Sequence, residues 1–397
     1  GLRPDDRMVA IPSHDGGFNV ERSEDGPYKV HTRRYNRARS NNPFESVVEF
    51  SSLDLMKTFP PSTERFRVEM RQGGSLKVRP LPVRVFNIIR KFKRPDVNPL
   101  SAMVAFTGGV DAYAMAELGF SPNVILEWRP PEARDRSNGR FRDLSEVHAL
   151  NTLRNLKTPR AVINEDIYRV DPLMVKRICE EAGGTAVAHY SICCQDHSSS
   201  KSPKAKAAAI ESLDTSIDQI WPVLRQIEEC GFPVVMVENV APFETSQAGQ
   251  IFMSMLRRWD YHLTPMTMNA LDFGGIQGRK RFYLVASVFS GFEQVKPVET
   301  PRNTESIWPI VERRLHECRD VTETSFVRNR EASGRKAQMI TKDSTNCATI
   351  LKSQSRGVKD QLLISHQGRV FAPSEGLIKD LMGIAEEFDV SWMASEQ

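Results

Sequence analysis

The sequence predicts an α/β protein built on a doubly wound, mostly parallel sheet, with a small C-terminal lobe. Two observations support this fold class. Between about residues 102 and 290, short apolar runs alternate with helical patterns, which is typical of βα units. Polar residues able to do chemistry follow several of these runs, where open α/β sheets place their sites. After Ser290 the alternation stops, so a different arrangement is expected there.

The apolar runs are short and end in polar residues, as expected of strands buried on both faces of a sheet. They predict strands at Ala102–Phe106, Asn123–Glu127, Ala161–Asn164, Thr185–Ile192, Val234–Glu238 and Phe282–Val288. Apolar residues at helical spacing predict the intervening helices at Val110–Leu118, Val147–Leu156, Leu173–Ala182, Ile217–Cys230 and Ile251–Trp259. No internal repeat is present.

The first 99 residues differ from this pattern. Up to about Asn42 they combine few apolar residues with many charges, so we predict a partly irregular arm. From Lys77 to Arg94 positive charges alternate with apolar residues. That run is either a solvated face with a few core anchors or an edge that contacts phosphates. The expected divisions are 1–99 as an extension, 100–295 as a catalytic domain, 296–345 as a recognition region and 346–397 as a closing segment.

Bulk properties exclude some classes. The chain has 397 residues, a net charge of +4 and a pI near 8.7, which is compatible with a nucleic-acid partner. Its six cysteines lack any Cys-x-x-Cys spacing, so we expect reduced thiols and no metal site. No apolar stretch is long enough for a membrane span, and the charged N-terminus is not a signal peptide. We therefore expect no membrane partner and a cytoplasmic protein, or a nuclear one in a eukaryote.

Reactive side chains stand at the ends of three predicted strands. Cys193-Cys194-Gln195 follows the run that ends at Ile192, and Glu238-Asn239-Val240 closes the next strand. Gln277-Gly-Arg279-Lys-Arg281 leads into the strand that begins at Phe282. A thiol, a carboxylate and two guanidinium groups at strand ends predict a catalytic site rather than a packing pattern.

These residues, in this order, resemble the DNA (cytosine-5)-methyltransferase family. The family orders a glycine turn, an acidic residue after the second strand, an Asp after the third, Pro-Cys-Gln, Glu-Asn-Val and Gln-x-Arg-x-Arg. The chain has, in that order, Phe106-Thr-Gly108-Gly109, Glu127-Trp128, Asp166-Ile167, Cys193-Cys194-Gln195, Glu238-Asn239-Val240 and Gln277-Gly-Arg279-Lys-Arg281. Each element alone is a weak signal, but six in order are strong. The resemblance extends from about residue 100 to the end.

The resemblance implies a Rossmann-like methyltransferase that moves the methyl group of S-adenosyl-L-methionine to C5 of cytosine, leaving S-adenosyl-L-homocysteine. The implied partner is double-stranded DNA, bound by a monomer, with the target base flipped out of the helix. Two alternatives remain: an RNA cytosine-5 methyltransferase of the tRNA-modifying branch, or a catalytically inactive DNA-binding relative.

The resemblance also assigns catalytic roles. Cys194 aligns with the nucleophile that adds to C6 of cytosine, and Glu238 with the group that assists at N3. Asn239 would brace the nucleophile's loop, Arg281 would hold the cytosine O2, and Arg279 would order the loop or a phosphate. Cys193 stands where the family has Pro, which offers a rival thiol, but the register favours Cys194.

For the cofactor, the resemblance assigns the turn formed by Phe106, Thr107, Gly108, Gly109 and Val110. Its glycine pattern is sparser than the family's Phe-x-Gly-x-Gly-Gly. Three further positions match residues that hold the rest of the ligand. Glu127 would bind the ribose hydroxyls, Trp128 would stack on adenine unless it is a plain core aromatic, and Asp166 beside Ile167 would accept from the adenine amino group. The family's Gly-Asn-Ser-Val-like turn has no counterpart near Gln397, which is expected to weaken donor binding.

Several polar residues are predicted to contact DNA. The stretch 196–206 is expected to be a mobile loop that closes over the flipped base. In the 296–345 region, basic side chains would read base edges, although a charged linker has a similar composition. The predicted DNA-binding residues are Gln195, Ser198, Lys201, Gln277, Arg328, Arg330 and Arg335.

Overall fold

In the computed structural model the described residues are 2–391, except 14–15, 35–43, 60–62, 64, 72, 82–83, 94, 132–142, 158, 198–201, 213–214, 292–295, 333–337, 352–353 and 355–360. The chain divides into two compact units, Gly1–Arg90 and Lys91–Gln397. No helix in the described part is both long and apolar enough to cross a membrane.

The second unit is organised around a seven-stranded sheet in the order β10-β9-β8-β11-β12-β15-β13. The strands are β8 Ser101–Ala105, β9 Ser121–Glu127, β10 Ala161–Asn164, β11 Val187–Ser191, β12 Val234–Val240, β13 His262–Asn269 and β15 Lys280–Ser287. β8 to β12 pair in parallel, whereas β15 runs antiparallel to both of its neighbours. The order reverses at β8, so the predicted doubly wound, mostly parallel fold is confirmed.

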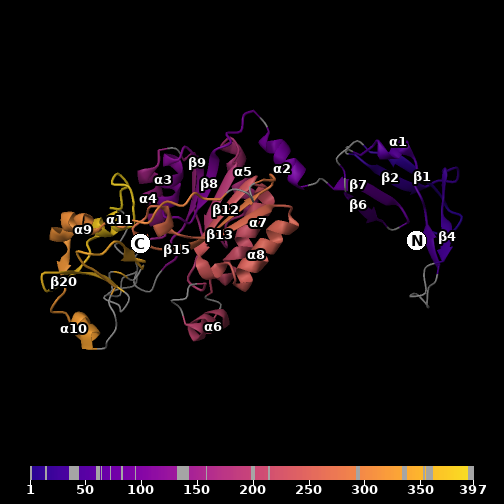
Figure 1. The fold of residues 1–397 in the computed structure, drawn as a ribbon. Coiled ribbons are helices and arrows are strands. Elements are labelled where there is room, and N and C mark those ends of the chain that lie inside the picture. The colour runs from indigo at the N-terminus through magenta and orange to yellow at the C-terminus, as the bar shows by residue number, and fades with distance from the viewer. Residues whose placement is uncertain are drawn as a thin grey trace. The chain divides into compact units, whose positions relative to one another are not determined.

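Helices cover both faces of this sheet (Figure 1). α3 (Val110–Glu117) and α4 (Val147–Asn155) lie on one face. α5 (Pro172–Glu181), α7 (Ile220–Cys230) and α8 (Gln247–Arg258) lie on the other. Because all of β8 is buried between these layers, its sequence is a continuous run of small and apolar residues. Each of these helices was predicted; the expected helix from Ile217 begins as the short 3-10 turn η2 (Ile217–Gln219) before α7.

The Gly1–Arg90 unit has a sheet of its own where the sequence predicted a partly irregular arm. Five antiparallel strands follow the order β3-β1-β2-β7-β6. They are β1 Arg7–Pro12, β2 Phe18–Arg22, β3 Tyr28–Lys29, β6 Arg65–Met70 and β7 Leu76–Leu81. A pair formed by β4 His31–Arg34 and β5 Phe44–Val47, the helix α1 (Leu53–Met56), and a core of Met8, Phe18, Val20, Val30, Leu55 and Phe59 complete the unit. The prediction is therefore wrong for most of residues 7–34.

The C-terminal lobe, residues 307–381, contains a four-stranded sheet in the order β16-β20-β19-β17. Its elements are α9 Trp308–Arg314, the 3-10 turn η6 Leu315–Glu317, β16 Arg319–Asp320, α10 Ser325–Ala332, β17 Gln338–Ile340, β18 Cys347–Ala348, β19 Leu362–His366, β20 Arg369–Ala372 and α11 Glu375–Leu381. One core runs from Ile307 to Leu381. The lobe thus draws strands from both the expected recognition region and the expected closing segment.

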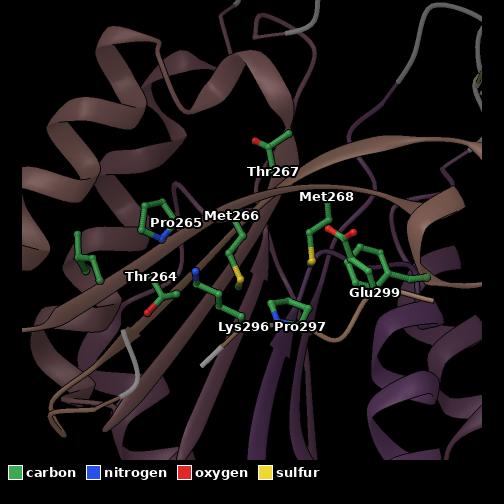
Figure 2. Close-up of a pocket in the computed structure, with 10 residues that line it drawn as sticks. Thr264, Pro265, Met266, Thr267, Met268, Lys296, Pro297 and Glu299 are labelled. Carbon is green, nitrogen blue, oxygen red and sulfur yellow. The ribbon is translucent and has the colours of Figure 1, made fainter. Parts of the chain in front are cut away.

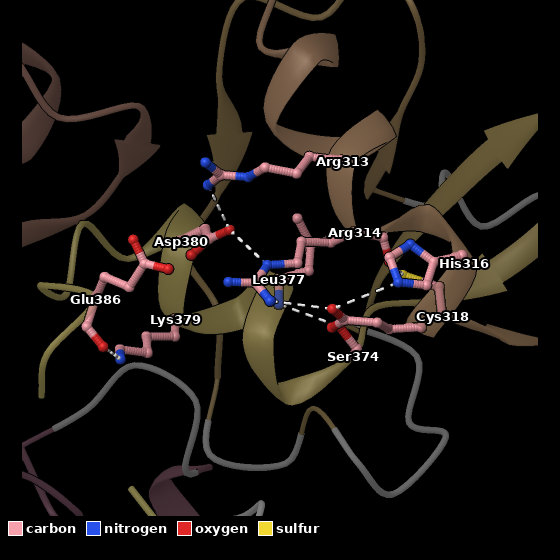
Figure 3. A network of polar contacts seen from close by, with 10 residues as sticks. Arg313, Arg314, His316, Cys318, Ser374, Leu377, Lys379, Asp380 and Glu386 are labelled. Atoms are coloured by element: carbon pink, nitrogen blue, oxygen red, sulfur yellow. Dashed lines mark hydrogen bonds and ion pairs between the residues drawn. The ribbon is translucent and has the colours of Figure 1, made fainter. Parts of the chain in front are cut away.

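An ion-pair network ties α9 to α11 in this lobe (Figure 3). Asp380 accepts from Arg313 Nη2 at 2.9 Å and from Arg314 Nε at 3.1 Å. Arg314 also donates to Glu317 at 3.0 Å. Desolvation acts to raise the pKa of Asp380, but the two arginines hold it below its usual range. The Asp380 carboxylate therefore links the two helices.

We expect Asp380→Asn to destabilise the lobe by about 1–2 kcal/mol, since it weakens two charged hydrogen bonds, one to an exposed arginine. The depressed pKa means that the stabilisation is complete above the unfolded carboxyl pKa of about 4 and is lost as pH falls through the folded value. Hydrogen exchange of α9 and α11 amides at pH 7 should show the loss. Asp343→Asn, at an exposed carboxylate of the same lobe, is the control; equal protection in both variants would contradict the role of Asp380.

Candidate functional site

The predicted site residues gather at the carboxyl edge of the parallel strands. The strand order reverses between β8 and β11, and open α/β sheets bind ligands in the crevice at such a point. The glycine turn follows β8, and Cys194 follows β11. Arg281 lies opposite Val240 because β15 runs antiparallel to β12, which brings its first residues to the same edge.

The loop that carries Cys194 is tied to β12. Asn239 is fully buried, and its Nδ2 donates to the carbonyl of Ile192 at 3.0 Å. Its Oδ1 accepts from Val240 N at 2.8 Å, which fixes the amide orientation. The amide of His197 donates to the Cys194 carbonyl at 3.1 Å, so the loop turns directly after the thiol. Asn239 thus supports the strand that leads to Cys194.

Glu238 is held on both of its carboxylate oxygens. Oε1 pairs with Arg281 Nε at 2.9 Å, and Oε2 accepts from Ser191 Oγ at 2.8 Å. The side chains of Arg281 and Glu238 are 18% and 17% exposed, so the ion pair is largely shielded from water. Ser191 and Tyr283 flank Glu238 on the neighbouring strands. This arrangement places a carboxylate and a guanidinium side by side at the opening of the crevice.

The surroundings of the Cys194 thiol disfavour its ionised form. Burial raises its pKa, and the neighbouring Cys193 and Glu238 add to that effect, whereas Arg281 opposes it. Desolvation and Arg281 lower the pKa of Arg279, which lies within electrostatic range of Cys194. A thiolate at Cys194 therefore depends on the nearby guanidinium groups.

The turn after β8 has a backbone that few residues tolerate. Phe106, Gly108 and Gly109 have φ angles of 63°, 62° and 90°, all in the left-handed region. A Cβ on Gly109 would lie 2.8 Å from the Oγ1 of Thr152 on α4. Asn151 Nδ2 donates to the Gly108 carbonyl at 3.1 Å and holds the turn from the same helix. This close approach of backbone to helix is what the two glycines provide.

Glu127 lies at the tip of β9 beside this turn. Its carboxyl is fully buried, and Oε1 accepts from Thr107 N at 2.8 Å and Oγ1 at 3.2 Å. Oε2 has no hydrogen-bond partner among the described residues. Burial raises the Glu127 pKa to about 8, although the Thr107 bonds act against it. His148 Nδ1 lies 4.0 Å from Oε2, beyond hydrogen-bond distance, so this buried oxygen can still accept a hydrogen bond from a ligand hydroxyl.

The other predicted cofactor residues lie at the ends of β9 and β10. Trp128 follows Glu127 and is half-buried, as is Asp166. Asp166 Oδ1 accepts from Tyr168 N at 3.2 Å, while Ile167 is 4% exposed. Val110 opens α3 and is half-buried. The turn, the buried carboxyl and these side chains together fit a nucleoside ligand.

The predicted DNA-binding residues differ in where they lie and in whether the structure describes them. Gln195 is exposed beside Cys194, and Arg328 is exposed and ion-paired with Glu323. Ser198, Lys201 and Arg335 lie outside the described residues, as does the side chain of Arg330. The loop expected over 196–206 includes the start of a helix, α6 (Pro203–Glu211), which Ser202 caps.

Gln277 is buried in this structure. It is 4% exposed, and β14 (Gln277–Gly278) pairs in parallel with β18 of the C-terminal lobe. The amide of Cys347 also donates to the Ile276 carbonyl at 2.9 Å. Gln277 thus joins the lobe to the loop before Arg279, and its contact with DNA stays a prediction.

Two polar residues near the crevice were not predicted. His189 lies within the apolar run that forms β11, and its Nε2 is 2.7 Å from Asp111 Oδ2 on α3. In the sequence, the feature that could have pointed to this pair is a histidine inside an otherwise apolar strand.

A separate groove of about 410 Å³ runs along the edge strand β13, where Met266, Met268 and Pro297 line it (Figure 2). It contains none of the predicted site residues.

Comparisons with known proteins agree with this fold. A family model described as C-5 cytosine-specific DNA methylase matches residues 179–389. No curated protein matches the sequence.

Solved structures with the same fold include three methyltransferases. The S. pombe Dnmt2 methyltransferase is 16% identical with a TM-score of 0.51, covering 73% of this chain and 88% of that one. A Spodoptera frugiperda DNMT2 mutant is 13% identical with a TM-score of 0.53, covering 75% and 92%. The Entamoeba histolytica methyltransferase EhMeth is 12% identical with a TM-score of 0.50, covering 76% and 91%. At these identities the likeness shows the fold.

Proposed function

The chain belongs to the C-5 cytosine-specific DNA methylase family, and we propose that it methylates C5 of cytosine in double-stranded DNA. The observation that carries this proposal is the meeting of Cys194, Glu238 and Arg281 at adjacent strand ends, with Asn239 holding the nucleophile's strand. The same assembly would serve any cytosine presented outside a helix. Methyl transfer to defined DNA and RNA substrates tests the choice between them.

The family uses S-adenosyl-L-methionine, which supplies the methyl group as an electrophile. Glu127 would accept from the ribose hydroxyls through its open Oε2, and the turn at Gly108 and Gly109 would let the backbone approach the ligand. Trp128 and Asp166 would hold the adenine. These residues fit the cofactor because a buried, unsatisfied acceptor and a left-handed glycine turn lie side by side.

In the proposed reaction the Cys194 thiolate forms a bond to C6 of the flipped cytosine, which makes C5 nucleophilic. Glu238 delivers a hydrogen bond or proton to N3 and Arg281 donates to O2, so the charge that develops on the ring is neutralised. C5 then takes the methyl group. Loss of the C5 proton to a base and of the Cys194 thiolate from C6 restores the aromatic ring.

The resting ion pair prepares these contacts. N3 and O2 are neighbouring positions on cytosine, and Glu238 Oε1 is 2.9 Å from Arg281 Nε. A base that enters between them would replace the ion pair with two hydrogen bonds, one from Arg281 to O2 and one to N3 from Glu238, which must first take up a proton from solvent. The confined, largely dry setting strengthens both of these contacts.

The Gly1–Arg90 unit supports a nucleic-acid partner. It carries 16 Lys and Arg against 11 Asp and Glu, whereas residues 91–397 carry 38 against 39. Arg67 on β6 lies directly opposite Arg79 on β7, whose guanidinium donates to Asn19 Oδ1 at 3.0 Å. Lys77, two positions along the same face, lies opposite Glu69. Like charges directly opposite each other in a sheet are unfavourable, and a phosphate backbone would relieve that cost.

We expect Arg67→Ala and Lys77→Ala to weaken duplex binding equally for all sequences and to flatten the salt dependence by about one unit of slope per lost phosphate contact. Lys57→Ala is the control, because Lys57 is exposed and already paired with Asp54 at 2.9 Å. Arg328→Ala should instead relax preference at one or two base positions. Binding and methylation mapping on a random-sequence library measure both effects. A changed motif in the Arg67 variant would transfer recognition to this unit.

An RNA substrate and an inactive DNA-binding relative remain the alternative functions. Transfer to a tRNA-like substrate with none to duplex DNA would establish the first. Duplex binding without methyl transfer by the wild-type chain would establish the second. Both outcomes can be read in one assay that measures binding and transfer on the same substrates.

A further inference from the structure

A buried histidine and a carboxylate lie where the strand order reverses, and the reaction described above uses neither. His189 on β11 is 4% exposed, and its Nε2 is 2.7 Å from Asp111 Oδ2. Asp111 belongs to the first turn of α3, two residues after Gly109. The pair therefore connects the strand of the nucleophile to the helix of the glycine turn.

The Asp111 carboxylate lies in the first turn of α3, directly after the glycine turn, and is bound to His189 on β11. The Asp111 side chain is 41% exposed, whereas that of His189 is 5% exposed, so the histidine binds the carboxylate from the buried side. Next to desolvation, the charge of Asp111 helps to raise the pKa of Glu127 on the cofactor side. The charge of Asp111 also helps to raise the pKa of Tyr283, which lies next to Glu238 on the catalytic side. His189 and Ser191 point to the same face of β11, and Ser191 Oγ donates to Glu238, so the His189–Asp111 pair lies near the catalytic side as well as beside the glycine turn.

The donor's reactive centre is a sulfonium cation, which must lie between the nucleoside held near Glu127 and the base held near Cys194. The product is an uncharged thioether in the same position, while the rest of the two molecules is identical. A fixed carboxylate near this space attracts the donor's centre and has no such attraction for the product's sulfur. Independently, the Oε2 of fully buried Glu127 accepts no hydrogen bond among the described residues, which favours a ligand at this edge of the sheet.

We propose that Asp111 is an electrostatic site for the sulfonium centre, positioned by His189, and that it makes the chain favour the methyl donor over the product. This inference rests on the proposed function, since it requires that cofactor. It gives Asp111 the role of a specificity residue and His189 that of a positioning residue.

The test is calorimetric binding of S-adenosyl-L-methionine and S-adenosyl-L-homocysteine to the full chain, without nucleic acid. Asp111→Asn keeps a side chain that can bond to His189 but removes the charge. We expect it to raise the Kd of the donor roughly tenfold and that of the product by less than about twofold. Asp111→Glu should retain the preference for the donor. Glu117→Gln, which removes a charge from the exposed far end of α3, should change neither Kd.

A His189→Asn variant should shift the donor-to-product ratio in the same direction but less, because the carboxylate stays while its orientation is lost. If Asp111→Asn raises the Kd of both ligands equally, or changes neither Kd, the inference is overturned and the cofactor assignment stays intact. A wild-type chain that binds neither ligand would overturn the cofactor assignment, and the inference with it.

Discussion

Replacing Cys194 with serine should abolish methyl transfer, on the order of 10³-fold or more, while duplex binding survives. A hydroxyl is a far weaker nucleophile than a thiolate at neutral pH, and serine occupies nearly the same volume. The exchange leaves the Asn239 bond to the Ile192 carbonyl untouched, so the loop keeps its support. Radiolabelled methyl transfer and a gel-shift assay on the same duplex measure the two properties.

Cys193→Ala is the matched control, because Cys193 is the adjacent thiol at the same strand end. Its backbone amide donates to Gln219 Oε1 at 3.2 Å. Alanine preserves that bond, so activity should remain near that of the wild type. Loss of activity in Cys193→Ala with activity retained in Cys194→Ser would move the nucleophile to Cys193.

Glu238→Gln should slow methyl transfer by roughly 10²–10⁴-fold, the usual contribution of a positioned acid or base. The amide cannot deliver a proton to N3, and it loses the charged contact with Arg281. The same change should make Cys194 more reactive towards alkylation. The Glu238 charge is one of the causes that raise the Cys194 pKa, after burial and Cys193, so its removal lowers that pKa.

The two effects have opposite signs, which separates them from general damage to the fold. Mass spectrometry of the Cys194 peptide after iodoacetamide treatment, at a series of pH values, follows the thiolate. Wild-type alkylation should rise at a pH above the ordinary thiol value, and the variant's rise should come at a lower pH. Glu244→Gln, which removes a carboxylate from the following turn, should change neither quantity. Slower alkylation in Glu238→Gln would contradict the electrostatic role of Glu238.

The parallel core was predictable because burial on both faces leaves an unbroken apolar run in the sequence. β10 was predicted to the residue, and β8, β9 and β12 within two residues at each end. The edge strand β13 was missed because polar residues and Pro265 interrupt it, and only an edge position tolerates that proline. β6 was missed because nearly all of its residues are exposed, which leaves no apolar pattern.

Residue order predicted which of the candidate catalytic side chains lie together, since each stands at a strand end and the fold brings such ends to one edge of the sheet. Contacts between residues far apart in the sequence could not be predicted. His189 and Asp111 are 78 positions apart, and only the return of the chain from β10 to β11 beside β8 joins them. The burial of Gln277 could not be predicted for the same reason, because it depends on β18, some seventy residues later.

The central claim is that Cys194 adds to C6 of a cytosine in duplex DNA. It is tested most directly by incubating the chain and S-adenosyl-L-methionine with a duplex that contains 5-fluorocytosine. The fluorine replaces the proton that must leave C5, so the adduct cannot break down after methylation. We predict a stable protein–DNA adduct, with the methylated base attached to the Cys194 peptide. Attachment at another residue, or a trapped adduct with fluorinated RNA and none with DNA, would contradict the claim.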